Sequence, residues 1–349
     1  MKKADYLIIG QGLAGSCLAL ELIGRGKQIL VMDRVDPHSA SRVAAGMFNP
    51  ITSKVRSTTW KAELLFPHLH QFYSSAEQLT GGKFYYPLPM YRPFSSIDDQ
   101  KGWDIFESKF LKKLHLKSVY GQMVYDPLGG LELSHSGFLD THSFVDSVNY
   151  YLNLRGCITP AFKELNVNEN FLEHCNLLAD RVVFCEGSHV VKNPYFNWLP
   201  ISKLKGEVLE LDADLPTDII FNRSVYLVPL GGKFKAGSTY DRSGQEGNSE
   251  AGIKDIQNRL SELLKVPFKT LAQDWGFRPV VRDRRPVIGQ HPDRKGIYIF
   301  NGLGTKGVSL APWVAECLSN WMESGESLPD ELNISRFYPL YFKYLQDSQ

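Results

Sequence analysis

The sequence has little that would point to a secreted, metal-binding or membrane protein. Its five cysteines form no C-x-x-C pair and are odd in number, so we expect them to be reduced and mostly buried. The nine histidines show no spacing typical of metal ligands, so we expect no bound metal. No apolar run approaches the roughly 18 residues that a membrane span needs. These absences favour a cytoplasmic protein that does not bind a membrane.

An excess of charge of either sign is also absent. Lysine and arginine number 39 against 38 aspartates and glutamates, which gives a formal net charge of +1. Such a balance gives no electrostatic reason to expect nucleic acid as a partner. The start, MKKADYLIIGQGLAG, superficially resembles a signal peptide, but glycines interrupt its apolar run and no A-x-A site follows. We therefore read it as part of the mature fold, in a chain long enough for about two domains.

A glycine-rich turn near the start has the spacing of a dinucleotide-binding loop. Gly10, Gly12 and Gly15 form G-x-G-x-x-G between the apolar run DYLII and a helix-like segment that stops near Gly24 and Gly26. In such a loop the first glycine allows the tight turn, the second lets the backbone approach a pyrophosphate, and the third lets the helix pack close to the strand. The phosphates then lie at the helix N-terminus, where free N–H groups favour negative charge.

An acidic residue stands where this kind of loop needs one. A second predicted strand over 28–32 ends at Asp33, which lies 18 positions after Gly15. This matches the acid, about 20 residues on, that binds the ribose hydroxyls, and it disfavours a ribose that carries a 2′-phosphate. The next residue, Arg34, could stack on the adenine or face solvent.

A second glycine loop occurs near the other end of the chain. The segment IYIFNGLGTKGVSLAPWVAECL repeats the order of strand, glycine loop and helix, with Gly302, Gly304 and Gly307. One such loop is compatible with NAD or FAD alike. A second one, late in a long chain, favours a large flavin cofactor that is held at both ends.

Between the two loops the predicted elements alternate in type. We expect helices over 61–80, from GFLDTHSF to Gly156, and over 249–264, and a buried strand in LLADRVVFCEG. KGEVLELDADL and SVYLVPLGGKFKAGSTYD are typical of antiparallel strands, and FYYPLPMYRPFSS of short strands and loops. The pattern predicts an α/β fold, with a Rossmann-like cofactor domain interleaved with an antiparallel-sheet substrate domain. We place the cofactor domain at 1–80, 138–205 and 275–349, and the substrate domain at 81–137 and 206–274.

Motifs spread over the whole chain resemble the D-amino-acid-oxidase superfamily of FAD-dependent amine oxidoreductases, which includes sarcosine and glycine oxidases. They occur in one order: GQGLAG with Asp33, SRVAAGM, GFLD, ADRVVFCEGS, KGEVLEL, YLVPLGGKFKAGSTYDR, WGFRPVVRDRRPVIG and NGLGTKGVSLAP. The C-terminal pair is also similar to the oxidase domain of the bifunctional enzyme that finishes methylaminomethyl-uridine in tRNA. The resemblance implies FAD, a two-domain fold, and oxidation of a C–N bond by hydride transfer to the flavin.

Resemblance and glycine loops together assign a set of cofactor residues. Gly46 and Gly187 would allow close approach to the flavin, and Lys306 would lie near the pyrimidine end of its ring or face solvent. Val43 and Gly276 stand where some relatives attach flavin through histidine or cysteine, so we expect FAD to be non-covalent. The residues that we expect to bind FAD are Gly10, Gly12, Leu13, Ala14, Gly15, Asp33, Arg34, Ser41, Ala45, Gly46, Gly187, Gly302, Gly304, Thr305, Lys306 and Gly307.

Three further residues receive catalytic roles from the resemblance. Arg278, in WGFRPVV, matches the arginine that grips a substrate carboxylate, although it could instead be a structural partner of Asp274 or Asp283. Tyr226 matches the hydroxyl that assists this arginine, or is a tyrosine of the sheet core. Lys235 resembles the lysine that promotes reaction of reduced flavin with O₂. Strand alternation puts Lys233 on the same face, so position alone does not choose between the two lysines.

Three functions are compatible with these features. The first is an FAD oxidase or dehydrogenase that acts on a small amine or amino acid, with O₂ or another electron acceptor. The second is a flavoprotein that acts on a modified tRNA, which the near-neutral charge and the missing methyltransferase half disfavour. The third is a flavin-binding protein without catalysis.

Overall fold

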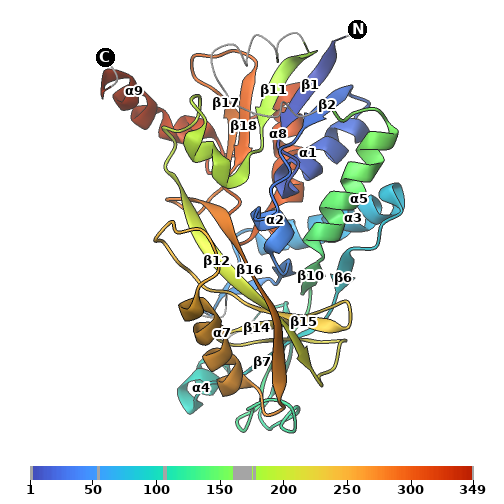
Figure 1. Cartoon of the computed structure of the whole chain (residues 1–349), viewed down its shortest axis with the longest axis vertical. Coiled ribbons are helices and arrows are strands. Elements are labelled where there is room, and N and C mark those ends of the chain that lie inside the picture. Colours follow the sequence, from blue (N-terminus) through green and yellow to red (C-terminus); the bar gives the residue numbers. More distant parts are fainter. Residues whose placement is uncertain (1–2, 53–55, 105–107, 160–174, 176–177, 348–349) are drawn as a thin grey trace.

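The structure is a computed structural model that describes residues 3–52, 56–104, 108–159, 175 and 178–347. Two large sheets lie toward opposite ends of the long axis, and both termini lie at the same end (Figure 1). The α/β architecture predicted from the sequence, with one mainly parallel and one mainly antiparallel sheet, is confirmed.

The first sheet has the strand order β17-β18-β11-β1-β2. Neighbours are parallel except β17, which pairs antiparallel with β18 at the edge, a departure from the purely parallel sheet that the sequence suggested. Its strands are β1 (Ala4–Ile9), β2 (Ile29–Met32), β11 (Ala179–Phe184), β17 (Val287–Gln290) and β18 (Ile297–Asn301).

Helices bury this sheet because its central strands are apolar on both faces. Tyr6, Leu7 and Ile8 of β1 are all completely buried, as expected for a strand covered on both sides. Helices α1 and α8 pack against each other, and α3 packs on α8. Figure 1 shows these helices beside the sheet with α5 next to α1. The four helices are α1 (Leu13–Gly24), α3 (Ala62–Thr80), α5 (Thr141–Leu154) and α8 (Gly307–Ser324).

The second sheet has the order β16-β12-β15-β14-β13-β7-β9-β8. All its neighbours are antiparallel except β13 and β7, and α7 (Glu250–Leu263) packs on β12. Its strands are β7 (Met90–Pro93), β8 (Leu111–His115), β9 (Gly130–Leu133), β12 (Ile201–Ala213), β13 (Ile220–Asn222), β14 (Tyr226–Leu230), β15 (Lys233–Gly237) and β16 (Phe268–Val281).

The two long strands β12 and β16 connect the regions of the molecule. They pair along their whole length, from Ile201↔Val281 to Ala213↔Phe268, and run from the middle of the molecule into the second sheet (Figure 1). The predicted domain boundaries at 205/206 and 274/275 fall inside these strands. The division into two domains stays a prediction.

The remaining described elements are short or peripheral. One small sheet has the order β3-β10-β6, and another pairs β4 with β5. Their strands are β3 (Met47–Phe48), β4 (Ile51–Thr52), β5 (Ser57–Thr58), β6 (Tyr85–Pro87) and β10 (Gly137–Leu139). The other helices are α2 (Ala40–Val43), α4 (Ile97–Asp104), α9 (Tyr338–Asp347) and the 3₁₀ turns η2 (Gly187–Lys192) and η3 (Ile334–Phe337).

Local signals explain where several elements begin and turn. Ser249 caps α7 by accepting a hydrogen bond from the Gly252 amide at 3.0 Å, and Asp140 caps α5 through the Ser143 amide at 3.2 Å. Positive φ angles at Gly231 and Gly232 form the two-residue turn that joins β14 to β15. These helices and this hairpin agree with the sequence-based expectation.

Candidate active site

A cavity of about 800 Å³ runs between the two sheets. One part of its wall follows the carboxyl ends of β1, β2 and β11 and the loop between β18 and α8. The opposite part comes from β12, β14, β15, β16 and α7. Ligands of open α/β sheets bind at the carboxyl ends of the strands, so this is the expected place for a cofactor.

The first glycine turn fits a close-lying phosphate. Gly10 has φ +97°, and a Cβ there would lie 2.6 Å from the carbonyl oxygen of Cys185. A Cβ at Gly15 would overlap the carbonyl oxygen of Gly10, so Gly15 is needed for the packing of α1 on β1. Gly12 differs, because its Cβ would meet only Ser41, at 3.1 Å from Oγ. The free space at Gly12 therefore faces the cavity, where it leaves room for a ligand.

Polar contacts fix the surroundings of this turn. Gly12 is the N-cap of α1 and provides no side-chain cap, which leaves the helix N-terminus available to an anion. Ser41 Oγ accepts a hydrogen bond from the Leu13 amide at 2.9 Å. Asp33 Oδ1 accepts one from the Gln11 amide at 2.8 Å, which ties the acid after β2 to the glycine turn. The donors and the acid have the chemistry that pyrophosphate and ribose require.

The second glycine loop lies across the same cavity. Gly302 and Gly304 have φ angles of +77° and +57°. Asn301 Oδ1 accepts a hydrogen bond from the Gly302 amide at 2.7 Å, and its Nδ2 donates to the Gly187 carbonyl at 3.0 Å. Asn301 was not predicted from the sequence, although a polar residue that ends the apolar strand IYIF is a usable signal. It links the two loops that follow β18 and β11.

Lys306 is a half-buried cation in the cavity wall. Its Nζ donates to Thr52 Oγ1 at 3.1 Å and to Thr59 Oγ1 at 2.9 Å. Burial lowers its pKa to about 8, and the nearby Arg285 acts in the same direction. Of the two positions expected for Lys306, near the flavin or facing solvent, the structure favours the one in the cavity wall.

Most predicted cofactor residues meet at this cavity. The predicted residues that line it are Gly10, Gly12, Leu13, Ala14, Asp33, Arg34, Ser41, Ala45, Gly46, Gly187, Gly304, Thr305, Lys306 and Gly307. Gly15 and Gly302 do not line it, and they support the loops from behind. The fold itself requires glycine at position 46, because φ is +65° there and a Cβ would overlap the carbonyl oxygen of Leu139.

Arg278 reaches the cavity from β16. Its Nη2 donates to Ser238 Oγ at 2.7 Å, and Nη1 donates to the Thr239 carbonyl at 3.4 Å. The guanidinium also lies 5.3 Å from the ring centre of Tyr240. Gly206 on β12 makes room for it, since a Cβ there would overlap the guanidinium.

The alternative partners of Arg278 are engaged elsewhere. Asp283 pairs with Arg336 at 2.9 Å, and Asp274 lies 4.0 Å from His38. Among the described residues, no carboxylate lies within ion-pair distance of Arg278. A guanidinium that lines a cavity and has no carboxylate partner is suited to bind a carboxylate of a ligand.

Tyr226 and Lys235 are related to the cavity in different ways. Tyr226 lines the cavity, and burial raises its pKa to about 12, so its hydroxyl stays protonated near neutral pH. Lys235 does not line the cavity, but its Nζ donates to the carbonyl of Val43, a wall residue, at 3.3 Å. Burial lowers the pKa of Lys235 below its ordinary value. Lys233 instead pairs with Glu210 at the surface, so Lys235 is the lysine that reaches the cavity wall.

Several lining residues had no usable signal in the sequence. Arg259 lies on the amphipathic helix α7, where a charge followed the pattern of a solvated face. Ser238 and Tyr240 lie in a polar loop after β15. Glu186 stands beside the glycine turn, and its Oε2 accepts a hydrogen bond from Asn193 Nδ2 at 2.5 Å. Burial raises the pKa of Glu186 to about 7.

Glu186 makes stability depend on pH. Because its pKa is about 7 in the folded protein against an ordinary 4.5, the folded state binds more protons between these values, and the free energy of unfolding falls as pH rises. We expect Glu186→Gln to remove this fall, with a gain over the wild type of about 1–3 kcal/mol at pH 8 and little gain below pH 4.5. Urea unfolding at several pH values measures it. Equal slopes for both proteins would contradict this assignment.

The described residues contain no group of three or more histidine, cysteine, aspartate or glutamate side chains that could hold a metal ion. Within the same residues, every helix is too short or too polar to cross a bilayer.

The chain is similar to known proteins along most of its length. Residues 5–321 match the protein family described as FAD dependent oxidoreductase. The bifunctional protein ThiO/ThiG of Trichormus variabilis is 25% identical over 95% of this chain and 55% of its own length. The tRNA 5-methylaminomethyl-2-thiouridine biosynthesis bifunctional protein MnmC of Marinobacter nauticus is 23% identical over 90% of this chain and 54% of its own. The chain thus spans about half the length of these relatives.

A solved structure shows the same fold. The crystal structure of glycine oxidase from Geobacillus kaustophilus superposes with a TM-score of 0.74 at 18% identity, covering 95% of this chain and 97% of that one. The resemblance that the motifs predicted is confirmed at the level of family and fold.

Proposed function

Because the chain belongs to the family of FAD dependent oxidoreductases, we propose that it oxidises a C–N bond of an amino acid or secondary amine. The observation that carries this proposal is Arg278, a guanidinium with no carboxylate partner among the described residues, in the cavity that the glycine loops line. Such a pair of features lets one cavity hold a flavin at one end and a carboxylate-bearing amine at the other.

The residues at the parallel sheet fit FAD. The open side of Gly12, the N-terminus of α1, whose N-cap has no side chain, and Asp33 would hold the pyrophosphate and ribose. Lys306 would lie close enough to the cavity to favour negative charge on the ring system. Bound FAD would accept a hydride from the carbon next to the nitrogen, and O₂ or another acceptor would then take up the electrons.

The chain's own residues would bind and orient the substrate. Two parallel hydrogen bonds from Arg278 to the substrate carboxylate would fix the direction of the substrate. The protonated hydroxyl of Tyr226 would add a donor beside them. The substrate nitrogen must be neutral when the C–H bond breaks, and hydride transfer requires no protein base for that hydrogen. We propose that Lys235 is the cation that favours reaction with O₂. Its Nζ donates to the carbonyl of Val43, a residue of the cavity wall, so its positive charge lies next to that wall.

We also propose that FAD is held without a covalent bond. Val43 provides no nucleophile, and at Gly276 a Cβ would lie 2.8 Å from the His38 carbonyl oxygen, so a cysteine would not fit there. Denaturation with acid is expected to release all yellow colour into the supernatant. Colour that stays with the precipitated protein would contradict this proposal.

Product analysis tests the reaction itself. FAD-loaded protein is incubated in air with single amino acids and N-methyl amines, and the released ammonia or amine and the oxo compound are measured. We expect both products in equal amounts from at least one compound. Release of neither product from any compound would count against a small-amine substrate.

A modified tRNA is the second candidate, and the similarity to MnmC is what favours it. The net charge of +1 does not favour binding to tRNA. Binding to tRNA that weakens steeply with added salt would support this candidate, because each neutralised phosphate releases counterions.

A further inference from the structure

The part of the cavity wall that residues 206–279 form carries positive charge only. Its described lining residues from 206–279 include Arg223, Arg259 and Arg278 and contain no aspartate or glutamate. The acidic lining residues, Asp33, Asp36 and Glu186, all belong to the part near the parallel sheet. Arg278 accounts for one carboxylate, so the other two cations exceed what a simple amino acid needs.

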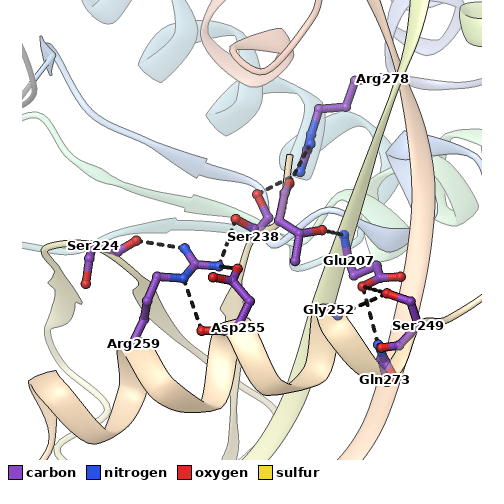
Figure 2. Close-up of polar contacts among 10 residues, drawn as sticks. Glu207, Ser224, Ser238, Ser249, Gly252, Asp255, Arg259, Gln273 and Arg278 are labelled. Atoms are coloured by element: carbon purple, nitrogen blue, oxygen red, sulfur yellow. Dashed lines mark hydrogen bonds and ion pairs between the residues drawn. The ribbon is translucent and has the colours of Figure 1, made fainter. Parts of the chain in front are cut away.

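Arg259 is placed beside Arg278 by a shared neighbour. Arg259 Nη2 donates to the Ser238 carbonyl at 3.2 Å, and Arg278 Nη2 donates to Ser238 Oγ at 2.7 Å. A second donor of Arg259, Nη1, reaches the Ser224 carbonyl at 2.9 Å. Figure 2 shows the two arginines directed toward Ser238, Arg259 from helix α7 and Arg278 from the opposite side. Ser224 and Ser238 both line the cavity, so the Arg259 guanidinium lies between two wall residues.

Arg259 has an acidic partner, which lies outside the cavity lining. Its acidic partner, Asp255, lies at 2.6 Å one helical turn earlier, but this carboxylate is 53% exposed and does not line the cavity. Solvent screens the exposed Asp255 carboxylate, so this pair contributes little to stability. Arg223, the third cation, donates to the backbone carbonyls of Tyr125 and Glu262, and neither Glu262 nor Asp99, the carboxylates that act on its charge, lines the cavity. The field at this end of the cavity therefore favours more than one negative charge.

We propose that Arg259 binds a second anionic group of the substrate, in addition to the carboxylate that Arg278 binds. The substrate class is then an amino acid or N-substituted amino acid that carries a further carboxylate, or a phosphate or phosphonate of the same charge. This inference rests on the proposed function, since it assigns the substrate of that same cavity. Arg259 acts as a specificity-determining residue.

Equilibrium binding tests the inference without turnover. FAD-loaded protein is titrated with acetate, malonate, succinate and phosphonoacetate, and the shift of the flavin absorption band reports binding. We expect at least one dianion to bind at least about tenfold more tightly than acetate, because it gains a charge-assisted hydrogen bond. Malonate or succinate as the tighter ligand indicates a second carboxylate, and phosphonoacetate indicates a phosphate-like group.

Two variants and a control assign the effect to Arg259. Arg259→Gln is expected to reduce the preference for the dianion to less than about threefold. Arg259→Lys, which keeps the charge but loses the planar fork, is expected to retain part of it. Arg242→Gln removes the same charge from an exposed residue outside the cavity and is expected to keep the full preference.

Two results would overturn the inference. The first is acetate binding as tightly as every dianion in the wild type, which does not depend on any variant folding. The second is a preference that persists in Arg259→Gln. If dianions bind as expected while no amine or amino acid yields product, the proposed reaction fails and the anion site remains.

Discussion

Replacement of Arg278 by alanine lowers kcat/KM for a carboxylate-bearing substrate by about 10²- to 10⁴-fold. The reason is the loss of two charge-assisted hydrogen bonds of about 1.5–3 kcal/mol each. Steady-state kinetics with the best substrate of the wild type measure this effect. FAD content should not change, because the Arg278 guanidinium donates to Ser238 and Thr239 and not to a glycine loop.

Two comparisons separate substrate binding from general damage. Arg282→Ala removes an exposed arginine from the end of the same segment, outside the cavity, and should leave kcat/KM within about twofold. Gly206→Ala should lower kcat/KM although it leaves Arg278 in the sequence, because the added methyl group overlaps the guanidinium and displaces it. Normal kinetics in Arg278→Ala would show that this arginine has a structural role.

The second large effect is expected at the first glycine loop. Gly12→Ala should weaken FAD binding at least about 100-fold, roughly 3 kcal/mol, because the methyl group would enter the space where the pyrophosphate approaches the backbone. The fold should tolerate the change within about 1 kcal/mol, since φ at Gly12 is −75° and the new Cβ would meet only Ser41 Oγ. Fluorescence titration of the FAD-free variant with FAD measures the affinity.

Other glycines of α1 provide the reference points for that experiment. Gly24→Ala adds a methyl group with no neighbour within 4 Å, so it should bind FAD normally and be neutral or slightly stabilising. Gly15→Ala is less informative, because its methyl group would overlap the Gly10 carbonyl and disturb the fold itself. Unchanged FAD affinity in Gly12→Ala would contradict the assignment of this loop.

Much of the fold could be predicted because its signals are local. The glycine spacing, the cap at Ser249 and the Gly231–Gly232 turn each depend on a few adjacent residues, and the structure has the corresponding elements. The antiparallel edge strand β17 and the small sheet of β3, β10 and β6 were not predicted. All these strands are too short to show a period, and β10 pairs with strands that are distant in sequence.

Site residues that belong to one motif could be predicted from the sequence. Site residues that only tertiary contacts bring together could not. Lys306 was singled out in its loop, but its partners Thr52 and Thr59 are more than 240 positions away. Arg259 stands four residues after Asp255 on an amphipathic helix, which from sequence indicates a solvent-exposed ion pair. Its approach to Ser238 depends on how α7 packs over β12, which no local pattern records.

The most direct test of the central claim is an anaerobic absorbance scan of FAD-loaded protein against amino acids and N-methyl amines, with acidic members included. The account predicts that at least one compound bleaches the band of the oxidised flavin, and that Arg278→Ala slows this bleaching while it keeps its FAD. A protein that cannot be loaded with FAD, or a loaded protein that none of the compounds bleaches, would contradict it.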